Sequence, residues 1–206
     1  MFLPASNSDV LVVCAPVTDV DTDVPLFPIE RYREISECSN PSVKREKYLV
    51  WKLLERVVKE RYNLDFENIM FTKNENGKWI CPDFFFSLSH SFDLLCVAIS
   101  DMPVGVDVER MRDFSTRLAE RVMTDDELRY GLSLDCTERD RFFLECWVKK
   151  ESIFKMKGDK TLSPRKINTL DSTAQVTSSR IGKDEYLVSV ASLCSEKYEL
   201  IYVEEI

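Results

Sequence analysis

The sequence predicts an α/β protein in which both halves of the chain contain strands and helices. Three observations lead to this class. Short valine-rich apolar runs are typical of strands, two long stretches carry apolar residues at helical spacing, and Met102-Pro103 interrupts the pattern near the middle of the chain. The interruption predicts a boundary between two parts of similar size.

In the first half, the apolar run at 9–15 predicts a buried strand, and the prolines and aspartates of 16–30 predict a loop. Apolar residues recur at helical spacing from 42 to 62, which predicts a helix with its first serine as the N-cap. The stretch NENG at 74–77 predicts a turn. Residues 84–100 then contain two strand-like runs, which predict a hairpin.

In the second half, residues 104–109 (VGVDVE) predict a strand, and residues 115–130 have helical periodicity. A long amphipathic helix is predicted over 139–158, ending at its glycine. The tail alternates in the manner of strands at 186–191 and 199–203.

The bulk composition narrows the class of protein. The chain has 206 residues and a formal net charge of −8, which argues against a general nucleic-acid binder. Seven cysteines without a C-x-x-C pair signal neither a zinc site nor a disulfide framework. The first 15 residues lack the pattern of a signal peptide, and no apolar run reaches membrane-spanning length, so we expect a cytoplasmic protein that does not bind membranes.

The predicted strand at 104–109 places two carboxylates on one face. Side chains alternate along a strand, so the three valines share one face, whereas Gly105, Asp107 and Glu109 share the other. Two neighbouring carboxylates repel each other unless a positive charge lies between them, and a hard divalent cation is a common solution. A solvated strand edge is the alternative interpretation.

The predicted helix at 139–158 carries Glu151 and Lys155 one turn apart on the same face, with Trp147 one turn earlier. By itself, a Glu–Lys pair at this spacing is usually a weak surface salt bridge.

A third element, FSLSHS at 86–91, contains His90, the single histidine of the chain. A zinc site made of several histidines is therefore impossible, and a Ser-His-Asp hydrolase would have to use this residue. Flanked by Ser89 and Ser91, His90 offers donors suited to phosphate oxygens. A hydrogen-bonded turn is the alternative.

Together the three elements resemble the 4'-phosphopantetheinyl transferases of the surfactin-synthetase-activator type. That family shows S-H-S, then G-[IV]-D-[IV]-E, then W-x-x-K-E-[SA]-x-x-K, in this order. The matching stretches are SHS at 89–91, GVDVE at 105–109 and WVKKESIFK at 147–155. With looser similarity at Gly77-Lys78 and at 44–47, the resemblance covers most of residues 30–165.

The resemblance implies an enzyme that transfers the 4'-phosphopantetheine arm of coenzyme A to a serine of an acyl or peptidyl carrier protein and releases 3',5'-ADP. It implies Asp107, Glu109 and Glu151 as the ligands of Mg²⁺. A carboxylate beside the metal, Glu151 before Glu109, is expected to take the proton from the carrier serine. Lys155 is expected to contact the phosphates.

For coenzyme A, the resemblance implies that Ser89 and His90 hold phosphate oxygens and that Lys78 lies near the adenine or pyrophosphate. Arg31 and Lys47 match basic positions that bind the 3'-phosphate in the family. The sequence departs from the pattern at Glu34, where a second basic residue is often found, and Arg33 is a possible substitute.

The family fold consists of two pseudo-symmetric lobes, each with a small antiparallel sheet and a long helix. We therefore expect an N-terminal lobe at 1–103 on the coenzyme A side and a C-terminal lobe at 104–206 with the metal site and the carrier-protein side, in a monomer. The basic run at 149–166 has two interpretations, a solvated helix face or a patch that attracts an acidic carrier protein.

Several points stay open at this stage. The sequence does not indicate the carrier protein or its pathway (fatty acid, polyketide or nonribosomal peptide biosynthesis). It also does not indicate a preference for Mg²⁺ over Mn²⁺ or whether acyl-coenzyme A is tolerated as a substrate. A non-catalytic module that binds carrier proteins or coenzyme A is the alternative function. A phosphate-transferring enzyme with a P-loop is disfavoured, because the sequence lacks the G-x-x-x-x-G-K-[ST] pattern.

Overall fold

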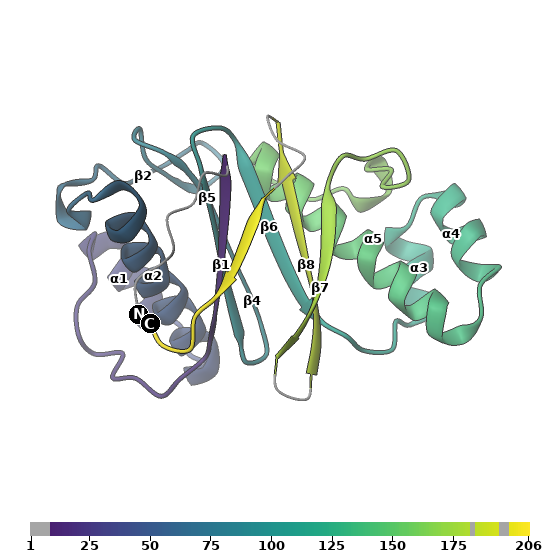
Figure 1. The fold of residues 1–206 in the computed structure, drawn as a ribbon, viewed down its shortest axis with the longest axis horizontal. Helices are drawn as coiled ribbons and strands as arrows, with labels where there is room; N and C mark the ends of the chain where they lie inside the picture. Colours follow the sequence, from purple (N-terminus) through teal and green to yellow (C-terminus); the bar gives the residue numbers. More distant parts are fainter. Residues whose placement is uncertain (1–8, 182–183, 194–197) are drawn as a thin grey trace.

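The computed structural model describes residues 9–181, 184–193 and 198–206, which form four layers (Figure 1). Helix α2 (Pro41–Tyr62) covers one sheet, a second sheet packs against the first, and helix α5 (Cys136–Lys157) covers the second sheet. Each sheet is thus paired with one helix of 22 residues. This confirms the predicted α/β class and the pairing of a small sheet with a long helix in each half.

The first sheet has the strand order β4-β5-β1-β9. Its strands are β1 (Val10–Pro16), β4 (Phe85–Ser91), β5 (Leu94–Ser100) and β9 (Glu199–Tyr202). The β4–β5 and β1–β5 pairs are antiparallel, as expected, but β9 joins β1 in parallel. The alternating tail predicted a strand but did not indicate its partner. Because β9 comes after residue 103 and yet joins β1, the boundary between lobes at 103/104 stays a prediction.

The second sheet is antiparallel and has the order β6-β8-β7. Its strands are β6 (Val104–Arg110), β8 (Asp184–Ser192) and β7 (Gln175–Ile181). Because β8 lies in the middle, β6 is an edge strand of this sheet, and β4 is an edge strand of the other. The edges of β4 and β6 meet, which joins the two halves of the molecule.

The remaining elements are short. They are α1 (Ile29–Ser36), the single-turn helix η1 (Phe66–Asn68), the small hairpin of β2 (Thr72–Lys73) and β3 (Trp79–Ile80), α3 (Thr116–Val122), α4 (Asp125–Leu132) and the single-turn helix η2 (Pro164–Lys166). Figure 1 shows α3 and α4 at the end of the molecule beyond α5.

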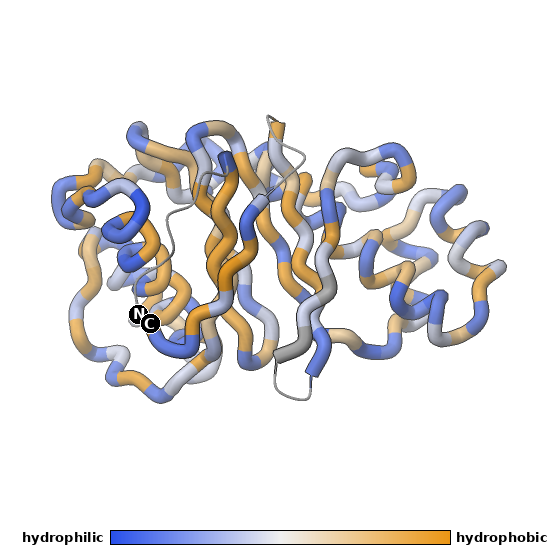
Figure 2. Tube along the Cα trace, in the orientation of Figure 1, coloured by the Kyte–Doolittle hydropathy of each residue, from blue (hydrophilic) through white to orange (hydrophobic). Residues whose placement is uncertain are grey.

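Three hydrophobic clusters correspond to the three interfaces between layers. The first lies between α2 and its sheet around the fully buried Trp51, the second between the two sheets, and the third around Phe143 of α5. Figure 2 shows the hydrophobic residues concentrated on the central strands and on the inner side of α2. Burial of these apolar surfaces is the main force that holds the layers together.

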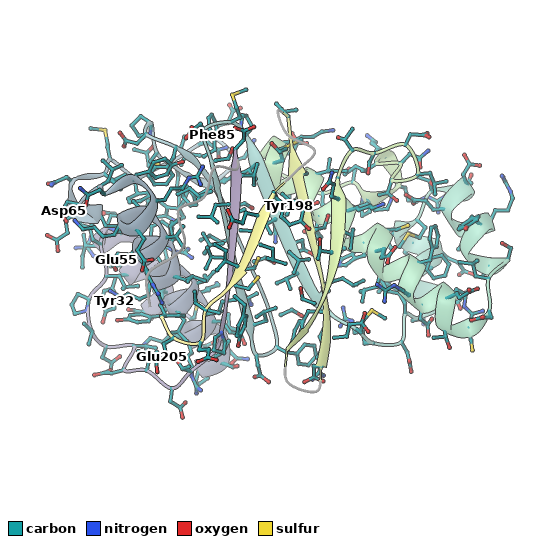
Figure 3. The ribbon with its side chains drawn as sticks, viewed as in Figure 1. Tyr32, Glu55, Asp65, Phe85, Tyr198 and Glu205 are labelled. Carbon is teal, nitrogen blue, oxygen red and sulfur yellow. The ribbon has the colours of Figure 1, made fainter. Side chains whose placement is uncertain are left out.

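Side-chain hydrogen bonds join the two sheets at both edges. On one edge, hydroxyls of β4 bind backbone N–H groups of β6, as described below. On the other edge, Tyr198, labelled in Figure 3 at the start of β9, hydrogen-bonds through its hydroxyl to Thr177 of β7. Unpaired N–H groups at a strand edge need such partners when they are buried.

Several predicted elements differ in their limits. Asn40, rather than Ser42, caps α2, because its side chain accepts hydrogen bonds from Ser42 N and Val43 N while Pro41 takes the first helical turn. The predicted helix at 115–130 is two helices, since Thr124 forms a capping box with Glu127 and starts α4. Strand β7 and helix α1 were not predicted, because neither has a clear apolar period.

Candidate active site

The predicted alternation of β6 is confirmed, and its second face meets a helix instead of water. Val104, Val106 and Val108 are buried between the two sheets. On the other face, Gly105 lies directly against α5: a Cβ atom at this position would be 1.9 Å from the backbone oxygen of Ser152. The glycine therefore allows α5 to approach β6 closely enough for side chains of the helix to reach Asp107.

Asp107 is 6% exposed and lies at the centre of the site. Its Oδ1 accepts hydrogen bonds from Lys155 Nζ at 2.8 Å and from the hydroxyl of Ser89 at 2.8 Å. Lys155 Nζ also donates to Ser89 Oγ at 3.0 Å. Three elements, β4, β6 and α5, thus contribute to one buried polar cluster.

Glu109 lies two residues further along β6. Its Oε2 accepts a hydrogen bond from Ser91 Oγ at 3.1 Å, and its Oε1 accepts one from Trp147 Nε1 at 3.3 Å. Arg112 is 3.6 Å from Oε2. Burial raises the pKa of Glu109, and the neighbouring charge of Asp107 raises that pKa further.

Glu151 of α5 completes the acidic group. Burial raises its pKa, and the charges of Asp107 and Glu109 act in the same direction, whereas Lys155 lowers it. Within the described ranges no hydrogen bond or ion pair to the Glu151 carboxylate is formed. The surface salt bridge that is usual for a Glu–Lys pair at this spacing is not formed between Glu151 and Lys155, because Lys155 binds Asp107 instead.

The described residues contain no group of three or more His, Cys, Asp or Glu side chains arranged to hold a metal ion. Asp107 nevertheless offers a free oxygen, because its Oδ2 is buried and has no hydrogen-bond partner. An unpaired carboxylate oxygen is costly in a buried position. Carboxylate oxygens are the donors that Mg²⁺ prefers, so the chemistry of this site suits such a cation.

The C-terminal end of α5 is held by the first half of the chain. Lys78 Nζ donates to the backbone oxygen of Lys155 at 2.6 Å, and Asn76 Nδ2 donates to that of Gly158 at 2.8 Å. A cation at the last carbonyls also interacts favourably with the helix dipole. Burial lowers the pKa of Lys78, with a further contribution from the charge of Lys155.

A cavity of about 350 Å³ lies at this junction. Its walls include Lys78, Trp79 and Leu88 from the first half and Phe154, Lys155 and Lys160 from the second. Basic groups from both halves and apolar walls suit a ligand that has both anionic and apolar portions.

Ser89 and His90 lie on opposite faces of β4, as strand alternation requires. Whereas Ser89 binds Asp107, His90 Nδ1 is 2.9 Å from Glu46 Oε2 of α2. Burial lowers the pKa of His90, Glu46 raises it, and the charges of Lys155 and Lys47 lower it. His90 therefore lies within electrostatic range of lysines from both halves of the molecule.

Arg31 of α1 and Lys47 of α2 belong to the first half of the chain and have their own partners there. The guanidinium of Arg31 packs 5.0 Å from the ring centroid of Trp51 and 3.5 Å from Glu34 Oε2, and its Nε is buried without a hydrogen-bond partner. Lys47 Nζ contacts Cys38 Sγ at 3.4 Å. Glu34, the departure from the family pattern, also pairs with Lys73.

The basic run at 149–166 is neither a fully solvated face nor a uniform patch. Lys150 is fully buried and pairs with Glu127 at 2.7 Å, and Arg165 pairs with Asp125 at 2.5 Å. Lys157, Lys160 and Lys166 are exposed. The apolar spacing of the helix did not indicate that Lys150 points into the core.

Sequence reasoning missed the role of Ser91 and the polar role of Trp147. Ser91 follows Ser89 by two residues, as Glu109 follows Asp107, so the matching spacing of the two strands was an available signal. The contact of Trp147 Nε1 with Glu109 could not be predicted without the position of α5 on β6.

This geometry, with carboxylates on a strand edge facing a Glu–Lys helix, agrees with a comparison of the sequence with protein families. Residues 103–203 match the model of the 4'-phosphopantetheinyl transferase superfamily, and this part of the chain belongs to that superfamily. The match confirms the resemblance to this family. It includes the motifs at 105–109 and 147–155, whereas SHS at 89–91 lies outside the matched residues.

Individual relatives agree with this assignment. Over 109 residues the chain is 35% identical to the 4'-phosphopantetheinyl transferase psf-1 of Bacillus pumilus. The aligned part covers 52% of this chain and 47% of the relative. Over 109 residues it is 35% identical to ffp of Bacillus subtilis and 32% identical to Sfp of Bacillus subtilis strain 168, in each case across 52% of this chain and 49% of the relative. The chain thus matches about half the length of these relatives. None of the described helices is long and apolar enough to cross a membrane.

Proposed function

We propose that this protein transfers the 4'-phosphopantetheine arm of coenzyme A to a serine of an acyl or peptidyl carrier protein and releases 3',5'-ADP. The observation that carries the proposal is the contact of Lys155 with Asp107 at the buried junction of β4, β6 and α5. It joins the family's strand motif to its helix motif in one site. The names of the relatives support transfer of the phosphopantetheine arm.

Asp107, Glu109 and Glu151 are the residues proposed to hold Mg²⁺. The free Oδ2 of Asp107 and the raised pKa values of Glu109 and Glu151 support this assignment, because a divalent cation would relieve both the unpaired oxygen and the repulsion. When bound, the ion supplies positive charge that stabilises the negative charge of the pyrophosphate.

Glu151 is the proposed base for the carrier serine. Within the described ranges its carboxylate forms no hydrogen bond or ion pair, so that an oxygen is available to accept the proton of the serine. Glu109, the second candidate, is already engaged by Ser91 and Trp147. In the proposed step the serine Oγ loses its proton to Glu151 and forms a bond to the phosphorus that carries the pantetheine arm. The bond from that phosphorus to the oxygen of 3',5'-ADP breaks.

Lys155 and Lys78 are the proposed contacts of the pyrophosphate. Both line the cavity at the junction of the two halves, and both carry a cationic donor of the kind that binds phosphate oxygens. His90 and Ser89 are proposed to assist from β4. Arg31 and Lys47 are proposed to bind the 3'-phosphate; the unpaired Nε of Arg31 supports a ligand there.

The test is incubation of the protein with an apo carrier protein, Mg²⁺ and coenzyme A that is labelled in its pantetheine arm. The proposal expects label on the carrier protein and an equal amount of 3',5'-ADP. Binding of coenzyme A or of the carrier protein without transfer, over a panel of fatty-acid, polyketide and nonribosomal peptide carriers, would indicate a non-catalytic binding module instead. The same panel identifies the carrier protein.

A further inference from the structure

A row of three serines on β4 lines the edge of β6. Their hydroxyl oxygens accept hydrogen bonds from alternate backbone N–H groups of β6: Ser87 from Val106 at 3.0 Å, Ser89 from Val108 at 3.3 Å and Ser91 from Arg110 at 3.2 Å. All three serines are buried. Equal spacing on two neighbouring strands produces the same contact three times.

Two of these serines also contact a carboxylate. Ser89 donates its hydroxyl hydrogen to Asp107 Oδ1 at 2.8 Å, and Ser91 donates to Glu109 Oε2 at 3.1 Å. The position that corresponds for Ser87 is Gly105, which has no side chain. The structure therefore contains an internal control: three similar bridges between strands, of which two hold a carboxylate and one does not.

Glu109 needs this support more than Asp107 does. A glutamate has one more rotatable bond than an aspartate, and the ion pair of Glu109 with Arg112, at 3.6 Å, is longer than the 2.8 Å pair of Asp107 with Lys155. Ser91 holds Oε2 and Trp147 holds Oε1, so that the carboxylate is fixed between β4 and α5. Hydrogen bonds to ligating carboxylates orient them and tune metal affinity.

We propose that Ser91, together with the indole N–H of Trp147, is a positioning residue that orients the Glu109 carboxylate for a divalent cation. The inference rests on the proposed function, because it assumes that Glu109 is a ligand of that cation. It assigns to Ser91 a role beyond the bridge to Arg110, and it separates this role from that of Ser87.

The experiment is titration of the intact protein with Mn²⁺ in the presence of saturating coenzyme A, because Ser87 lines the cavity proposed for coenzyme A. Free Mn²⁺ is measured by electron paramagnetic resonance. Ser91→Ala and Trp147→Phe should weaken Mn²⁺ binding by roughly 10-fold or more, the usual effect of losing such a supporting hydrogen bond. Ser87→Ala loses the same type of bridge without a carboxylate, and its Mn²⁺ affinity should stay at the wild-type value. Thermal unfolding should show a loss of stability for both variants, larger for Ser91→Ala, because Ser91 also loses its hydrogen bond to Glu109.

Equal Mn²⁺ affinity in wild type and Ser91→Ala would overturn the positioning role of Ser91. Equal weakening of Mn²⁺ binding in Ser87→Ala and Ser91→Ala would also overturn it, because the effect of Ser91 would then come from strand pairing alone. Both results leave the proposed transfer intact, provided that wild type still binds Mn²⁺ and modifies a carrier protein. Absence of Mn²⁺ binding by wild type would overturn the metal assignment and this inference together. Since Trp147→Phe removes the second donor and keeps an aromatic ring, it provides the test if Ser91→Ala does not fold.

Discussion

The ammonium group of Lys155 lies 2.8 Å from Oδ1 of Asp107. This contact joins the helix motif to the strand motif and places a positive charge beside Asp107, and the same charge lowers the pKa of Glu151. Lys155 is therefore the counter-charge of Asp107.

Replacement of Lys155 by methionine should destabilise the metal-free protein by about 2 kcal/mol. The loss of one partner leaves Asp107 buried without a counter-charge, and the cost is below that of a fully buried pair because the side chain of Lys155 is 25% exposed. Urea unfolding with and without Mn²⁺ checks this, and Mn²⁺ should restore part of the loss. Lys157→Met changes an exposed lysine of the same helix and should have little effect; equal stability of the two variants would contradict the counter-charge role.

The pH dependence of stability should reflect the raised pKa of Glu151. The folded state holds this proton more tightly than the unfolded state, so the free energy of unfolding should fall as the pH rises from the usual carboxyl value of 4.5 through the raised value. Glu151→Gln removes this contribution. In metal-free buffer the variant should gain stability relative to wild type with rising pH, and its thermal unfolding should respond less to Mg²⁺. A constant difference between the two proteins at every pH would contradict the assignment.

Replacement of Gly105 by alanine should separate α5 from β6. The added Cβ would lie 1.9 Å from Ser152 O and 2.4 Å from Met156 N, and such overpacking costs about 3 kcal/mol. Mn²⁺ affinity should fall as well, since Lys155 and Glu151 would move away from Asp107. Gly77→Ala provides a comparison, because Gly77 has a φ of +84° but open space around it, so that only backbone strain of about 1 kcal/mol is expected. The prediction fails if Gly105→Ala is as stable as wild type.

Replacement of Lys150 by methionine should cost about 3 to 5 kcal/mol, because it leaves Glu127 charged and fully buried. The double variant Lys150→Met, Glu127→Gln should recover part of this loss, since no charge then remains buried and the amide oxygen still accepts the hydrogen bonds from Thr169. Chemical denaturation measures both effects. If the double variant were no more stable than Lys150→Met alone, the charge left behind would not be the cause.

The sequence was sufficient for the parts of the fold and site that depend on local periodicity. The alternation of β6 placed Asp107 and Glu109 on the face opposite the valines, and the helical spacing placed Lys155 one turn from Glu151. The partner of Lys155 was not predictable, because it depends on the close approach of α5 that Gly105 allows. For the same reason the burial of Lys150 was not predicted, since its partner Glu127 comes from another helix.

The parallel pairing of β9 with β1 also depends on contacts between distant parts of the chain. The tail alternates like a strand, but its side chains alone do not select an edge of one sheet over the other. The opposite faces of Ser89 and His90, by contrast, follow directly from strand alternation.

The most direct measurement is the intact mass of an apo carrier protein after incubation with coenzyme A, Mg²⁺ and either wild type or Asp107→Asn. The proposed function predicts a mass increase of one phosphopantetheine arm with wild type and little or none with the variant, with Mg²⁺ removal giving the result of the variant. Carrier modification at a similar rate by folded Asp107→Asn would contradict the central role of Asp107, and no modification by wild type with any carrier of the panel would contradict the transferase function itself.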